Sequence, residues 1–160
     1  MKRFKMLLAL AVASLIFAGQ AYAAEITAPK GWTKQNVSGM KFYISPADSP
    51  EDTFSENINI VHQKLLDEDV TYEQLIKVTV DGIKKMDPNY KLISKEKVKL
   101  AGVDAYKIVQ QFSINGKKFN STQYYVKKDG HCYCITCTAL PSTAKKYAPI
   151  FEKAIKTFKF

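Results

Sequence analysis

Two short turns in the second half of the chain constrain its fold more than any other feature. Asn115-Gly116 and Asp129-Gly130 are each flanked by runs of β-branched and aromatic residues. Such pairs suit the type I′ turn of a two-residue β-hairpin, because both turn positions need a positive φ. The two turns therefore predict three consecutive antiparallel strands joined by tight hairpins.

The turns also set the register of those strands. Counting back from each turn places Phe112 opposite Phe119, and Tyr125 opposite both Tyr106 and Cys134. Successive side chains of a strand point to opposite faces, so this register makes both faces of the sheet apolar in the middle. A sheet that is apolar on both faces is covered on both faces.

Two amphipathic helices can supply that cover. The first follows a capping box of Thr71 and Gln74, and Asp87-Pro88 ends it near Met86. The second has an apolar stripe at helical spacing that ends at Phe158. Pro149 lies within this stripe, so we expect a first turn from Ser142 and then a kink or a restart, with the proline near the first helical position.

Further strands are predicted over 40–44, 57–66 and 90–100, and Trp32 is expected to anchor the core. The stretch 45–56 holds two prolines and several acidic residues and is predicted to be a loop. The fold class is therefore α+β: a three-layer α/β/α sandwich with a mainly antiparallel sheet and one helix on each face. Its elements follow the order hairpin, helix, three strands, helix.

Residues 1–23 have the three parts of a cleavable secretory signal peptide. A basic start is followed by an apolar run from Met6 to Ala18 and by the cleavage motif Ala21-Tyr22-Ala23. The apolar run is about 13 residues long, and a membrane-spanning helix needs roughly 20. We expect residues 24–160 to be one exported, soluble domain, periplasmic or extracellular, with no transmembrane helix. With no cysteine beside the cleavage site, a lipoprotein is not expected.

The chain is basic, with a formal net charge of +9. Its lysines often come in pairs, such as Lys84-Lys85 and Lys127-Lys128. Such pairs are typical of a solvated surface that resists aggregation. Alternatively, they attract an anionic envelope component, either lipid headgroups or an acidic protein face. Nucleic acid is not an expected partner, because the aromatic residues are not interleaved with arginines as a base-stacking surface would require.

The residues that most suggest a metal site are His131, Cys132, Cys134 and Cys137. On a strand, however, Cys132 and Cys134 point to one face and Cys137 to the other, so the thiols cannot converge on one tetrahedral ion. Nor is a Cys132–Cys134 disulfide expected, because Cβ atoms two residues apart on a strand are too distant. We predict three buried, unpaired thiols, with a metal or redox site as the alternative and no cofactor.

No catalytic residue can be assigned. The only histidines are His62 and His131, and neither has a candidate nucleophile at a defined spacing. By alternation, His62 shares a strand face with Ile58 and Ile60, which predicts a partly buried, structural histidine. The common motifs for hydrolases, nucleotide-binding loops and zinc proteases do not occur. We therefore expect a protein that is not an enzyme.

Several short motifs along the chain resemble those of the bacterial PsbP-like proteins, which have the Mog1p/PsbP-like fold and include DcrB-type envelope proteins. The resemblance covers nearly all of the chain after residue 23. It implies the same three-layer fold and a binding or accessory role, because these proteins dock onto larger partners. The motifs are Pro29-x-Gly31-Trp32, Asn57-Ile58-Asn59-Ile60, Gly102-x-x-Ala105-Tyr106, Gln123-Tyr124-Tyr125, Tyr147-x-Pro149-Ile150-Phe151 and Phe158-x-Phe160.

Three functions remain open from the sequence. The first is an exported, non-enzymatic accessory protein that binds an envelope protein, and it predicts an exposed apolar patch at a sheet edge or loop. The loop 45–56 is one candidate contact surface. The second is a carrier or sensor of a small or lipidic anionic ligand, which predicts an enclosed apolar pocket. The third, a hydrolase, predicts a cleft that holds His62 or His131, or a pair of carboxylates.

Overall fold

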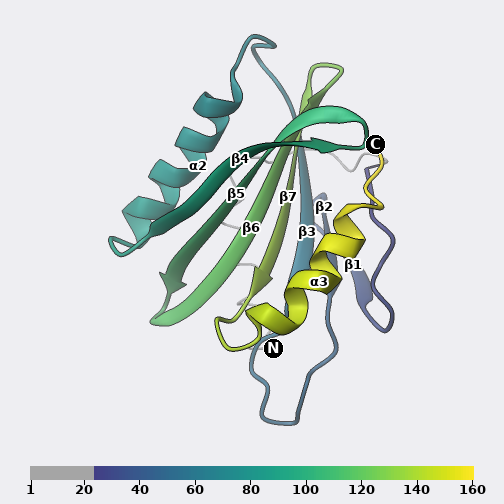
Figure 1. Cartoon of the computed structure of the whole chain (residues 1–160), viewed down its shortest axis with the longest axis vertical. Helices are drawn as coiled ribbons and strands as arrows, with labels where there is room; N and C mark the ends of the chain where they lie inside the picture. The colour runs from purple at the N-terminus through teal and green to yellow at the C-terminus, as the bar shows by residue number, and fades with distance from the viewer. Residues whose placement is uncertain (1–23) are drawn as a thin grey trace.

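The computed structural model describes residues 24–160 (Figure 1), so the predicted signal peptide lies outside the described residues. Seven strands form one sheet, with a helix against each face. Within this part of the chain, neither helix is long and apolar enough to cross a membrane. The elements are β1 (Thr33–Val37), β2 (Met40–Ile44), β3 (Asn57–Lys64), α2 (Tyr72–Met86), β4 (Lys91–Leu100), β5 (Val103–Ile114), β6 (Lys117–Lys128), β7 (His131–Ala139) and α3 (Ala144–Ile155).

The strand order across the sheet is β1-β2-β3-β7-β6-β5-β4, and all neighbouring strands are antiparallel. Each half of the sheet is a simple meander of consecutive strands. The halves meet where β3 pairs with β7, in the middle of the sheet (Figure 1). The strands at the two edges are therefore β1 and β4. The predicted α+β sandwich with a helix on each face is confirmed.

The two predicted hairpin turns are present. Asn115-Gly116 and Asp129-Gly130 all have positive φ values between 50° and 76°. The predicted register also holds, with Phe112 opposite Phe119 and Tyr125 opposite Cys134. The local turn chemistry therefore determines which residues face each helix.

Two further turns of the same kind were not predicted. Ser38-Gly39 joins β1 to β2, and Ala101-Gly102 joins β4 to β5. Neither begins with the asparagine or aspartate that favours a positive φ. At φ 49°, Ala101 occupies the left-handed region that alanine rarely adopts. The strand β1 was also missed, because its residues are polar and mostly exposed and carry no alternating apolar signal.

Helix α2 begins as its capping box predicts. The hydroxyl of Thr71 accepts a hydrogen bond from the backbone N–H of Gln74 at 3.2 Å, and the Gln74 side chain accepts one from the backbone N–H of Thr71 at 2.7 Å. The helix ends at Met86, and the side chain of Asp87 then accepts hydrogen bonds from backbone N–H groups, including that of Ser113 at 2.6 Å. The capping box therefore fixes where α2 begins, and the hydrogen bond from Ser113 ties the end of α2 to β5.

The predicted restart of α3, with Pro149 near its first position, is wrong. The helix runs without a restart from Ala144 to Ile155, with Pro149 in its interior, and it does not begin at Ser142. Proline is tolerated there because Pro149 and Lys145 are both exposed, so solvent can hydrate the Lys145 carbonyl that loses its helical partner. The helix instead begins after Thr143, whose hydroxyl donates a hydrogen bond to the buried carboxylate of Glu56.

Each helix covers a separate apolar core. The core under α2 includes Phe112, Phe119 and Tyr125, and the core under α3 includes Ile58 and Ile135. This explains why both faces of the sheet are apolar. The segment that precedes β1 also belongs to the α3 side.

The first described residues and the last ones are held together. Ala24 and Ile26 are buried in the α3-side core, and Glu25 exchanges two backbone hydrogen bonds with Lys159 at 2.9 and 3.0 Å. Trp32 packs against the same core but is only half-buried, so it is a less complete anchor than predicted.

Candidate functional site

The structure does not bring the candidate metal ligands together. Cys132 and Cys134 lie in the α2-side core, whereas Cys137 lies in the α3-side core. All three thiols are free and buried, and burial raises the pKa of Cys134 to about 12. Residues 24–160 contain no group of three or more side chains that could hold a metal ion. The thiols are arranged as core-packing residues, and His131 packs in a different cluster, against His62.

The two histidines contact each other, which the sequence did not predict. Their rings stack with centroids 4.7 Å apart and an interplanar angle of 29°. His62 also lies 4.8 Å from the ring of Tyr133, which in turn meets Phe160 at 5.1 Å. The ring nitrogen Nδ1 of His131 is 2.9 Å from the carbonyl of Asp129. The histidines thus belong to an aromatic cluster that closes the α3-side core near the C-terminal residue.

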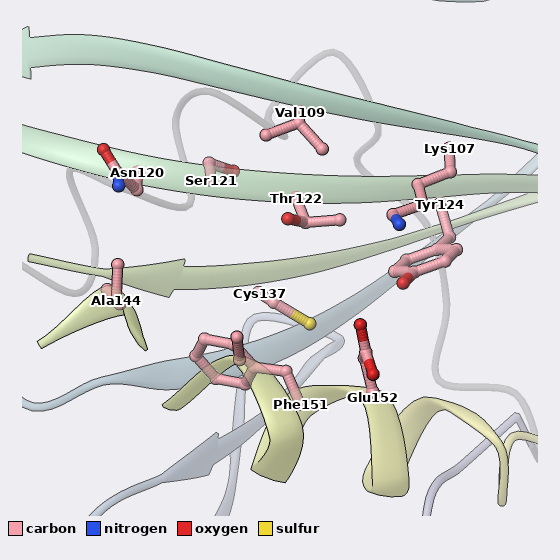
Figure 2. Close-up of a pocket in the computed structure, with 12 residues that line it drawn as sticks. Lys107, Val109, Asn120, Ser121, Thr122, Tyr124, Cys137, Ala144, Phe151 and Glu152 are labelled. Atoms are coloured by element: carbon pink, nitrogen blue, oxygen red, sulfur yellow. The ribbon is translucent and has the colours of Figure 1, made fainter. Parts of the chain in front are cut away.

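A small cleft lies between α3 and the outer half of the sheet (Figure 2). It has a volume of about 200 Å³. The cleft exists because α3 presents two alanines, Ala144 and Ala148, toward β5 and β6, where longer side chains would fill the gap. Val109, Thr122 and Phe151 form much of the remaining wall.

Three polar side chains line one end of this cleft. In Figure 2 the hydroxyl of Tyr124 and the carboxylate of Glu152 point toward each other. Lys107 forms an ion pair with Glu96, with Nζ and Oε1 3.1 Å apart. Burial, assisted by neighbouring groups that include Glu152 and Glu96, raises the pKa of Tyr124. Tyr124 therefore remains a neutral hydrogen-bond donor at physiological pH.

A second surface lies where α2 ends and β4 begins, and we call it the β4 edge surface. Among the large apolar side chains that are well exposed, three lie here: Met86 at 49% exposure, Leu92 at 43% and Ile93 at 56%. The basic residues of this surface are Lys84, Lys85 and Lys91. Figure 1 shows the end of α2 beside the start of β4, at one margin of the molecule.

The lysines of this region differ in their pairing. Lys95 binds Glu73 at 2.6 Å, and Lys99 binds Asp104 at 2.8 Å. By contrast, Lys85 and Lys91 form no ion pair with any residue in the range 24–160. The β4 edge surface therefore combines apolar side chains with lysines that form no direct ion pair within the described part of the chain.

A third surface is a groove of about 410 Å³ beside Trp32. It lies between the segment that precedes β1 and the outer side of α3. Trp32 packs edge-on against Phe151, with ring centroids 6.1 Å apart, and leaves part of its surface exposed. Lys30 and Lys153 line the groove along with Ile150.

The predicted contact loop 45–56 is exposed over most of its length and buried at its two ends. Residues 46–51 and Thr53 are exposed, whereas Ser45 and residues 54–56 are buried. Phe54 packs on Phe119, with ring centroids 5.1 Å apart. The end of this loop therefore helps to close the α2-side core.

Similar solved structures share this fold at low sequence identity. The cyanobacterial PsbP (CyanoP) of Synechocystis is 15% identical with a TM-score of 0.62, and the match covers 87% of this chain and 89% of that one. LpqN of Mycobacterium tuberculosis, involved in cell envelope biogenesis, is 12% identical with a TM-score of 0.62, over 85% of this chain and 82% of that one. The Ran-binding protein Mog1p of Saccharomyces cerevisiae is 12% identical with a TM-score of 0.60, over 88% and 93%.

Identities this low establish the fold alone. No match was found among curated proteins. The family model described as PsbP-like protein, however, matches residues 19–160, which include every residue after the predicted signal peptide. The chain therefore belongs to the PsbP-like protein family.

Proposed function

We propose that residues 24–160 form an exported, non-enzymatic binding protein of the cell envelope that docks onto a larger protein partner. The signal-peptide pattern of residues 1–23 supports export. Two proteins of the same fold support the role: Mog1p is a Ran-binding protein, and LpqN is involved in cell envelope biogenesis. This support is by analogy, because a shared fold does not specify a partner.

The observation that carries the proposal is the β4 edge surface. Single exposed apolar residues are common on soluble proteins and have no particular meaning. Here Met86, Leu92 and Ile93 gather at one end of a sheet edge, beside Lys85 and Lys91. An apolar spot with a charged rim is typical of a site that a protein partner covers.

A hydrolase has less support from the geometry. His62 and His131 stack on each other, His62 also packs against Tyr133, and neither histidine lines the cleft beside α3. Among residues 24–160, Glu152 supplies the only carboxylate that lines this cleft, so no pair of carboxylates meets there. The histidines fit a structural role better than an acid–base role.

The test is a crosslinking pull-down of the tagged protein from its own cell envelope, read by mass spectrometry. The control bait is an unrelated exported protein of equal size and charge. We expect one protein to be enriched at least ten-fold over the control. If only scattered anionic proteins are recovered, at equal levels with both baits, the proposed function is wrong.

One observation favours a second candidate, a carrier or sensor of a small or lipidic anionic ligand. The Trp32 groove combines an aromatic wall with Lys30 and Lys153, which suits an acyl chain that ends in an anionic headgroup. Trp32 is the only tryptophan, so its fluorescence reports on this groove. A saturable blue shift with dodecyl phosphate, absent with dodecyl trimethylammonium, would support the carrier. An unchanged spectrum would leave only the partner-binding role.

A further inference from the structure

The sheet has two edges that differ in what they can bind. The edge strand β1 has five residues, all polar except Val37, and none of its side chains is a well-exposed large apolar one. The other edge strand, β4, has ten residues and pairs only with β5. Alternate residues of an edge strand turn their backbone N–H and C=O groups outward, where another strand can pair with them. Strand β4 therefore offers a longer edge than β1 for pairing with an added strand.

A bulge exposes apolar side chains on this edge. Leu92 lies opposite Gln110 and Ser94 lies opposite Val109, so Ile93 is an additional residue that has no partner on β5. A bulge of this kind re-aims the side chains around it. Ile93 and its neighbour Leu92 are both exposed at the start of this edge, and Met86 is exposed at the end of α2.

The charge of the edge selects the chemistry of its partner. Lysines occur along β4 at 91, 95, 97 and 99, and the only acidic residue of the strand is Glu96. Lys95 and Lys99 are paired with carboxylates of neighbouring elements, so Lys91 and Lys97 are the lysines of β4 that form no ion pair within residues 24–160. The last turn of α2 adds Lys84 and Lys85. Complementary charge across an interface favours association, and like charge opposes it. An acidic partner segment therefore suits this edge, and a basic one does not.

A second copy of this chain is a poor occupant for the same reason. Pairing β4 with its own copy would place two strands side by side that each carry lysines without an ion pair, at 91 and 97, and like charges on adjacent strands are destabilising. A lipid surface is a poor occupant for a different reason, because lipid supplies no regular hydrogen-bond partners for the outward N–H and C=O groups of a strand. A peptide backbone supplies them.

We infer that the edge of β4 receives an extended, acidic segment of a partner protein as an eighth strand of the sheet. Apolar side chains of that segment cover Leu92 and Ile93, and its carboxylates meet Lys85 and Lys91. The inference rests on the proposed partner-binding function and adds to it the surface and the chemistry of the partner.

The test places a photo-crosslinking amino acid at position 93 of the exported protein and, as a control, at position 35 on the opposite edge. Both positions are exposed on edge strands, and Gln35 lies on β1. We expect position 93 to crosslink to one protein, at a segment rich in Asp and Glu that contains no proline. We expect no such crosslink from position 35.

Substitutions then test the contact with that partner. Ile93→Ser, which removes the apolar side chain without adding charge, is expected to weaken binding at least ten-fold, and Lys91→Glu at least three-fold. The matched control is Lys145→Glu, an exposed position on α3 that forms no ion pair in the described part of the chain, and its effect should stay below two-fold. A synthetic peptide of the crosslinked segment should slow amide hydrogen exchange in β4 at least ten-fold and leave β1 unchanged.

The outcomes separate this inference from the proposed function. Suppose that the pull-down enriches a partner but position 93 gives no crosslink, or a crosslink to lipid, to a second copy or to a basic segment. The proposed role of the β4 edge is then wrong, and the proposed binding function stands. The proposed role of the β4 edge is also wrong if position 35 gives the crosslink or if Ile93→Ser binds as well as the unaltered protein. If neither method recovers a partner, both proposals are wrong.

Discussion

Gln110 donates a hydrogen bond from its side-chain amide to the side-chain oxygen of Gln123 at 3.1 Å, and both side chains are completely buried. The same oxygen accepts a hydrogen bond from the hydroxyl of Tyr125 at 2.9 Å, and the amide of Gln123 donates one to Thr136 at 3.1 Å. The four side chains form a polar network on the α2 side of the sheet, within an otherwise apolar core.

Gln123→Ala should therefore be strongly destabilising. The substitution leaves buried polar groups of the neighbouring side chains without a partner, and each such group costs about 1 to 3 kcal/mol. We expect the free energy of unfolding in urea to fall by about 3 kcal/mol. The matched control is Gln111→Ala, which removes a 3.0 Å hydrogen bond to Asn120 at the surface and should cost less than about 1 kcal/mol. Equal losses for the two variants would contradict the role of the network.

The three cysteines should be unreactive in the folded protein. Cys132, Cys134 and Cys137 are buried, and burial raises the pKa of each thiol, that of Cys134 to about 12. The thiolate is the reactive form, so labelling requires unfolding. At pH 8 we expect an aromatic disulfide reagent to label none of them within an hour, and all three within a minute in 6 M guanidinium. Rapid labelling of one thiol without denaturant would show that its part of the core opens.

Tyr90 should make the fold sensitive to alkaline pH. Burial raises the pKa of Tyr90 from 10.0 to about 12, so the folded state holds this proton more tightly than the unfolded chain does. This contribution to stability is complete below pH 10 and is lost as the pH rises from 10 toward 12. Below pH 10, Tyr90→Phe should be the less stable protein, because it lacks the 2.8 Å hydrogen bond to Gln110.

The measurement is the urea midpoint of both proteins at several pH values. The difference in the free energy of unfolding between the unaltered protein and Tyr90→Phe should shrink steadily between pH 10 and 12. A constant difference across that range would mean that the pKa of Tyr90 is not raised in the folded state.

Pro149→Ala should stabilise α3. Proline in a helix interior is about 3 kcal/mol less favourable than alanine, because it removes a hydrogen bond and clashes with the preceding turn. Pro149 is exposed, so its replacement leaves no cavity. We expect a gain of about 1 to 2 kcal/mol by thermal or urea unfolding, because the observed helix already accommodates part of the strain. The control is Pro141→Ala, outside the helix, which should leave the free energy of unfolding nearly unchanged. A loss of stability in Pro149→Ala would mean that the proline ring makes a stabilising packing contact.

The elements that the sequence predicts well are those with local signals. The Asn115-Gly116 turn and the Thr71 capping box depend on residues within a few positions of one another, and both form as expected. The turn at Ala101-Gly102 carries no such signal, because alanine does not favour a positive φ. Its conformation depends instead on the pairing of the two strands that it joins.

What the sequence does not predict depends on distant partners. His62 and His131 meet only because β3 pairs with β7, and nothing near either residue indicates that pairing. Gln110 and Gln123 are polar, so their burial follows only from the hydrogen bonds that they make to each other and to Tyr90. The β4 edge surface likewise depends on an unpredicted bulge at Ile93 and on the position of that strand at the margin of the sheet.

The central pairing of β3 with β7 also governs when the sheet can form. Strand β3 (57–64) pairs with β7 (131–139), so the two halves of the sheet cannot join until most of the chain has been synthesised. Contacts so far apart in sequence form slowly, because a long loop must close before they give any stability. The seven-stranded sheet is therefore completed late, by the last of its strands to leave the ribosome.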